Sequence, residues 1–128
     1  MTLLRSALAA FLAVSLQAAP YRVVDFAGGG KAGDGGPALA ARFLSLEGVA
    51  RAVDGSIFVA AAAANRVRRI SATGIIEAYA GSARLKNPYG LATDPQGNLY
   101  IADYGNGRVL KVAADGTLTD AATGLKGP

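Results

Sequence analysis

The sequence predicts an all-β fold made of two four-stranded antiparallel sheets, and a repeat within the chain is the main observation behind this prediction. Residues 48–74 and 90–116 align without a gap at a spacing of 42 residues, with eight identities among 27 positions. In each copy, short apolar runs alternate with turns that contain glycine. A period of about 40–45 residues built from short strands is typical of one β-propeller blade. We therefore expect an incomplete β-propeller with two blades.

The composition restricts the chemistry that the chain can perform. It contains no cysteine and no histidine, so it lacks disulfides, thiolate ligands, His-ligated zinc and the Ser-His-Asp triad. The formal net charge is +4, and the basic residues concentrate only at Arg66, Arg68 and Arg69. These arginines lack the interleaved aromatic residues of a nucleic-acid site. We interpret them as a solvated outer strand face, with attraction of anions as the alternative, and expect no nucleic-acid partner.

Residues 1–19 have the pattern of a secretory signal peptide. Arg5 precedes an apolar run from Ala7 to Leu16, and small residues follow it. The run is shorter than the roughly 20 residues that a membrane span needs. We expect an extracytoplasmic protein, periplasmic or secreted, with no membrane contact after cleavage. The alternative is a retained apolar helix that anchors the chain.

Residues 21–43 follow, and we expect an outer strand and a glycine-rich inter-blade loop here. Tyr21–Ala27 is rich in β-branched and aromatic residues, and Pro37 favours a short helical turn after the glycines. The loop lacks the Gly-Lys-Ser/Thr ending of a phosphate-binding loop.

Each copy of the repeat supplies four strands and thus one blade. The first blade is expected over residues 44–82 and the second over 83–124, while residues 125–128 match 85–88 and would begin a further blade. The alanine run 60–64 is interpreted as a strand end and loop, because it aligns with the Ala-Asp-Tyr-Gly-Asn sequence of the second copy. Gly97 and Gly116 are predicted as turn glycines of the second blade.

Several motifs together resemble the NHL-repeat β-propellers. They are GDGGPALAARF at 33–43, the GVA and SIFVA runs of the first copy, and YGLATDPQGNLYIADYGNGRVLKV at 89–112. The resemblance extends from Val23 to the C-terminus. It implies a propeller that presents loops on one face to ligands or protein partners. The first copy departs from the pattern, because Ala61 stands where the second has Asp103 and Ala64 where it has Asn106.

Asp103, Asn106 and Arg108 are the polar residues that distinguish the second copy, and we predict a structural role for them. Asp103 can accept hydrogen bonds from backbone N–H groups, Asn106 tolerates a left-handed backbone, and Arg108 can pair with Asp103 across the turn. No residue of the sequence is assigned as catalytic, cofactor-binding or metal-binding.

Two functional classes stay open. The first is a non-catalytic binding scaffold for a protein or small-molecule ligand. The second is part of a metal-dependent lyase-like or lactonase-like propeller enzyme, whose site would need several carboxylates that converge on the channel. Closed propellers have 4–8 blades, so two blades predict either a fragment of a longer protein or a homo-oligomer that completes the ring.

Overall fold

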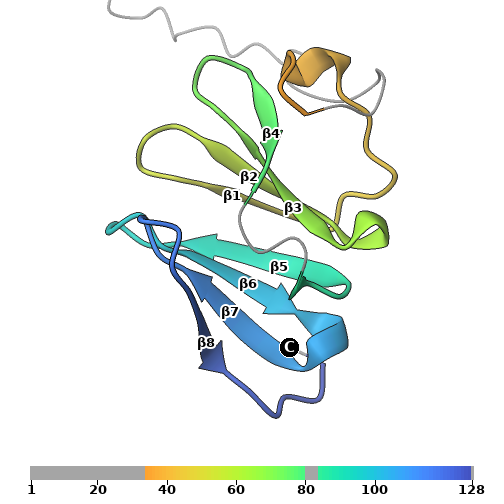
Figure 1. Cartoon of the computed structure of the whole chain (residues 1–128), viewed down its shortest axis with the longest axis vertical. Coiled ribbons are helices and arrows are strands. Elements are labelled where there is room, and N and C mark those ends of the chain that lie inside the picture. Colours follow the sequence, from red (N-terminus) through yellow and green to blue (C-terminus); the bar gives the residue numbers. More distant parts are fainter. Residues whose placement is uncertain (1–33, 80–83, 128) are drawn as a thin grey trace, which may run out of the picture.

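The computed structural model describes residues 34–79 and 84–127, and these form two four-stranded antiparallel sheets (Figure 1). The predicted all-β fold with two four-stranded blades is confirmed. In both sheets the strands follow one another in chain order. The first sheet contains β1 (Gly48–Arg51), β2 (Ile57–Ala61), β3 (Arg66–Ile70) and β4 (Ile76–Ala78), and the second contains β5 (Pro88–Thr93), β6 (Leu99–Asp103), β7 (Arg108–Val112) and β8 (Leu118–Ala122).

The signal peptide predicted for residues 1–19 and the strand predicted for Tyr21–Ala27 lie outside the described residues. Within the described ranges, no helix has the length and apolar character needed to cross a membrane.

The connection between the second and third strands of each sheet is a 3-10 turn. In the first sheet the alanine run continues β2 to Ala61 and then forms the turn η2 (Ala62–Ala64), after which Asn65 has a left-handed backbone with φ +50°. In the second sheet the turn η4 covers Tyr104–Asn106, and the left-handed residue is Gly107 with φ +60°. Asn106, which was expected only to tolerate such a conformation, does not adopt it. Glycine takes the position because it has no Cβ to clash there.

The two sheets pack face to face through an apolar cluster. Phe58 and Val67 of the first sheet contact Leu99, Ile101 and Leu110 of the second, and all five are buried. Because side chains alternate between the two faces of a strand, the opposite face of the second sheet carries other residues. These are Tyr100, Ala102, Val109 and Lys111, and each is half-buried.

The first strands of the two sheets are in close contact at a glycine. A Cβ added to Gly48 in β1 would collide with the backbone carbonyl oxygen of Tyr89 in β5. Glycine at this position therefore sets the spacing between the sheets.

Residues 34–44 cover part of the other face of the first sheet, around Val59, Ile70 and Ile76, together with the edge of β4. The Gly35 N–H donates to the Ile76 carbonyl at 2.6 Å, and the Ile76 N–H donates to Gly36 at 3.0 Å. The 3-10 turn η1 (Ala38–Ala40) follows, and Ala38 packs against Ile70 and Ile76. In Figure 1 this orange segment lies on the side of the first sheet that faces away from the second. The glycine-rich segment therefore also protects the edge strand of the first sheet.

Candidate functional site

The carboxylate of Asp103 is the centre of a buried polar network at the end of β6. Its side chain has no exposed surface. One oxygen, Oδ1, accepts a 2.7 Å hydrogen bond from the backbone N–H of Lys86. The other, Oδ2, accepts from Asn106 Nδ2 at 2.7 Å and from Arg108 Nε at 2.8 Å. The network ties the chain that enters the second sheet to the connection between β6 and β7.

Arg108 extends this network to the outer strand. Its NH1 group pairs with Asp120 of β8 at 2.9 Å, and its NH2 group donates to the Arg84 carbonyl at 3.0 Å. The hydrogen bond to Asp103, followed by the attraction of Asp103 and Asp120, raises the pKa of the guanidinium above its ordinary value. Two carboxylates therefore hold this one arginine.

The corresponding place in the first sheet has lost both carboxylates. Arg66 aligns with Arg108, but Ala61 replaces Asp103 and Ala78 replaces Asp120. Among the described residues, the carboxylate next to Arg66 is that of Asp34, whose Oδ2 is 3.8 Å from NH1, and 47% of the arginine side chain is exposed. A hollow of about 280 Å³ lies at this place. It is lined by Asp34, Arg42, Phe43, Leu44, Ala61, Ala64, Arg66 and Arg68.

Arg68 is buried beside this hollow, although the sequence interpretation placed it on a solvated face. Only 4% of the residue is exposed. Its Nε donates to Asp34 at 2.9 Å, its NH1 donates to the Arg42 carbonyl at 3.0 Å, and its guanidinium lies 4.9 Å from the centre of the Phe43 ring. The interpretation is wrong for Arg68 because residues 34–44 fold over this face and supply a carboxylate, a carbonyl and an aromatic ring.

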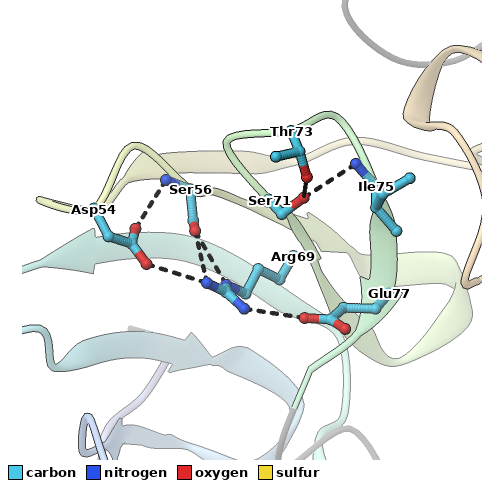
Figure 2. A network of polar contacts seen from close by, with 7 residues as sticks. All are labelled: Asp54, Ser56, Arg69, Ser71, Thr73, Ile75 and Glu77. Carbon is cyan, nitrogen blue, oxygen red and sulfur yellow. Dashed lines mark hydrogen bonds and ion pairs between the residues drawn. The ribbon is translucent and has the colours of Figure 1, made fainter.

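Arg69 projects from the opposite face of β3 and forms a separate network (Figure 2). Its NH2 group pairs with Asp54 at 3.1 Å, its NH1 group pairs with Glu77 at 3.1 Å, and Nε donates to Ser56 Oγ at 3.1 Å. Hydrogen bonds from Ser56, backbone and side chain, lower the pKa of Asp54, and Arg69 adds to this effect. The charge of Arg69 is thus balanced within the protein.

A second hollow, of about 430 Å³, lies between the two sheets next to Arg69. Residues of the first sheet and of the turns of the second line it together. They are Ala52, Val53, Asp54, Phe58, Arg69, Tyr79, Pro95, Gln96, Gly97 and Ala114.

The remaining acidic residues of the second sheet hold turns. Asp94 accepts hydrogen bonds from Asn98 Nδ2 at 2.7 Å and from the backbone N–H of Asn98 at 2.9 Å, and these bonds lower its pKa. Asp115 accepts from the Thr117 N–H at 2.9 Å, and its pKa is lowered for the same reason. Among the residues that the structure describes, no group of three or more acidic side chains is placed to hold a metal ion.

The turn and repeat residues predicted from the sequence lie at two opposite ends of the second sheet. Asp103, Asn106 and Arg108 come together at the end of β6, whereas Gly97 precedes β6 and Gly116 follows β7, at the opposite end of the sheet. Both glycines have a positive φ, +85° and +87°. Sequence reasoning missed Asp120, although its alignment with Ala78 repeats the replacement of a carboxylate by alanine and could have found it.

A family model described as the NHL repeat matches residues 85–112, which run from the segment held by Asp103 to the end of β7. Residues 85–112 are thus similar to an NHL repeat. The match lies within the copy in which the carboxylate network is complete. No curated protein matches this chain in sequence.

Solved structures resemble this chain in fold. A catalytically inactive virginiamycin B lyase from Staphylococcus aureus, solved with quinupristin, superposes with a TM-score of 0.56 at 23% identity, over 68% of this chain and 31% of the other. Regucalcin from Agrobacterium tumefaciens, described as a calcium-binding protein, gives 0.53 at 23% identity, over 63% and 30%. A streptogramin B lyase gives 0.53 at 17% identity, over 62% and 26%. The chain thus spans under a third of the length of these structures.

Proposed function

We propose that this chain is a non-catalytic scaffold that binds a small-molecule or protein ligand. The observation that supports this proposal most is that the acidic side chains are engaged in contacts within the protein. All but one of the acidic residues in the described ranges accept a hydrogen bond or form an ion pair within the protein. They are Asp34, Asp54, Glu77, Asp94, Asp103, Asp115 and Asp120.

Proton transfer needs a group whose pKa lies near the working pH. The pKa values of Asp54, Asp94 and Asp115 are instead lowered by the hydrogen bonds that they accept. Such carboxylates stay ionised and are weak bases. Their chemistry suits the fixing of turns and the pairing of arginines.

The two hollows support binding. Ligand sites usually have volumes of about 300–1,000 Å³ and combine an apolar lining with a few polar groups. The hollow of about 430 Å³ lies in the lower part of this range and the hollow of about 280 Å³ just below it, and both combine aromatic or aliphatic residues with at least one arginine. Their size favours small ligands or single side chains of a partner.

The test is a screen of small molecules by thermal shift, with recovery of each bound compound. Mass spectrometry of a stabilising compound after prolonged incubation should return it unchanged. Saturable conversion of the compound, lost in Asp94→Asn or Asp103→Asn, would contradict the scaffold.

A metal-dependent enzyme is the second candidate, and the similarity in fold to lyases and to a protein described as calcium-binding favours it. It requires carboxylates from further blades, since all but one of those in the described ranges have partners within the protein. Calorimetric titration with Ca²⁺ and Mg²⁺ separates the candidates. Heat of binding together with turnover that a chelator abolishes would support the enzyme.

The proposal includes export from the cytoplasm, which rests on the pattern of residues 1–19. N-terminal sequencing of the protein from the cells that produce it should begin near Ala18. A mature protein that begins at Met1 or Thr2 would contradict this part.

A further inference from the structure

The hollow in the first sheet occupies the place at which the second sheet has its buried carboxylate. Ala61 and Ala64, which line it, align with Asp103 and Asn106, and Arg66 aligns with Arg108. Leu44 aligns with Lys86, whose N–H group donates to Asp103 in the second sheet. The first sheet therefore keeps the arginine of the network but has no carboxylate at its centre.

The charge of this hollow is positive. Among the described residues that line it, Arg42, Arg66 and Arg68 are basic and Asp34 alone is acidic, so their formal charges sum to +2. Asp34 lies 2.9 Å from Arg68 and 3.8 Å from Arg66, so its short contact is with Arg68. Charge-assisted hydrogen bonds between a guanidinium and a carboxylate are among the strongest polar contacts in proteins. Arg66 has no such short contact with the residues that the structure describes.

The rest of the lining is apolar. Phe43 and Leu44 form one side, and Ala61 and Ala64 form the other. The volume of about 280 Å³ suits a compound with one compact apolar body. A ligand that combines such a body with an anionic head would match both parts of the hollow.

We propose that this hollow binds a small organic carboxylate, whose anionic group takes the place that Asp103 has in the second sheet. The ligand carboxylate accepts hydrogen bonds from Arg66 and from the Leu44 N–H, and its apolar body lies against Phe43. The proposal deepens the proposed function, on which it rests, by naming the ligand class and the site.

The experiment is a titration of the full chain, labelled with ¹⁵N, with benzoate and with its neutral analogue benzamide. We expect benzoate to shift the amide signals of Leu44, Ala61 and Arg66 in a saturable manner, and added salt to weaken the binding. Benzamide should bind at least about tenfold more weakly, because it lacks the charge that strengthens a hydrogen bond to a guanidinium.

Three variants locate the site. Arg66→Gln should weaken benzoate binding at least about tenfold, since it removes the charged donor. Ala61→Asp places the repeat's own carboxylate in the hollow and should abolish binding while raising the melting temperature. Arg51→Gln is the matched control, because Arg51 is an exposed arginine of β1 that does not line the hollow. It should bind benzoate as the unchanged chain does.

Each result decides the proposal. Saturable shifts at the three named amides, lost in Ala61→Asp and weakened in Arg66→Gln, support it. Equal binding of benzoate and benzamide, no binding at 10 mM (roughly the weakest affinity of interest), or binding that survives both variants overturns it. Arg66→Gln alters an exposed side chain, so its effect can be measured even if Ala61→Asp fails to fold. Conversion of bound compounds would instead overturn the scaffold function and leave the carboxylate site in place.

Discussion

Asp103 and Arg108 form a 2.8 Å ion pair in which the carboxylate is fully buried, and the equivalent pair in the first sheet, Ala61 and Arg66, has no carboxylate. The same two strands are joined in the same register in both sheets, since Asp103 is paired with Arg108 and Ala61 with Arg66. The backbone therefore tolerates the loss of the network. In the second sheet the network fixes the entering chain, whereas in the first sheet residues 34–44 pack over the equivalent place.

The first prediction concerns the stability supplied by Asp103. Asp103→Ala leaves the Lys86 N–H, Asn106 and Arg108 without their shared acceptor, and breaking a buried ion pair in this way costs about 3–5 kcal/mol. Urea unfolding followed by circular dichroism should show a loss of this size or a chain that no longer folds. Asp120→Asn is the control, because 46% of the Asp120 side chain is exposed, and such pairs contribute about 1 kcal/mol or less. Equal effects of the two changes would contradict the central role of Asp103.

The second prediction concerns the contact between the sheets at Gly48. The methyl group of Gly48→Ala would collide with the Tyr89 carbonyl, a backbone atom that cannot turn aside, so β1 and β5 must separate. Overpacking of this kind costs about 1–3 kcal/mol. Gly36→Ala is the matched control, since an added Cβ there meets nothing within 4 Å and φ is not positive. A Gly48→Ala chain that unfolds at the same urea concentration as the control would show that the sheets do not depend on this contact.

The sequence predicted the strands and turns well because they depend on local chemistry that the repeat displays twice. Glycines at 55 and 97 have φ values of +86° and +85°, as their turns require. Burial of Arg68 depends instead on Asp34, which is 34 residues away in the chain. The repeat alignment places Arg68 at the position of Leu110. It therefore shows that a charged residue replaces an apolar one, but it does not show which groups balance the charge.

The candidate site was partly visible in the sequence. The replacement of Asp103 by Ala61 is read directly from the alignment, yet the sequence alone cannot show whether the space closes. It stays open because Leu44 and Phe43 line it without filling it. Equally, Gly107 and not Asn106 takes the left-handed position, because Asn106 is the last residue of the 3-10 turn and Gly107 caps it.

The third prediction concerns pH. The pKa of Asp94 is lowered from its ordinary value of 3.8 by hydrogen bonds that need the ionised carboxylate. A carboxylate with a lower pKa in the folded state stabilises the fold above its unfolded pKa, and this stability is lost as the pH falls through the folded pKa. The melting temperature should therefore decline below about pH 4. Asp94→Asn, which cannot titrate, should start with a lower melting temperature at pH 7 and show a shallower decline. An identical acid profile would exclude Asp94 as a contributor.

The last prediction concerns self-association. The outward face of the second sheet carries half-buried Tyr100, Ala102 and Val109. In the first sheet, the apolar side chains of Val49 in β1 and of Leu46 just before it are exposed. The contact between the two sheets, in which Phe58 and Val67 pack on the second sheet, shows that one blade can cover the next. A second copy can repeat this contact head to tail, and a ring closes when the rotation allows it.

Closed propellers have 4–8 blades, so two to four copies of this two-bladed chain would complete one. Light scattering on the purified chain should therefore show oligomers of that size. Val109→Glu places a charge on the outward face and should shift the population toward monomer, whereas Lys126→Gln lowers the net charge by the same one unit outside the strands and should not. A soluble monomer of the unchanged chain that unfolds cooperatively would show that residues 34–44 and the sheet contact suffice for stability, and it would refute the assembly.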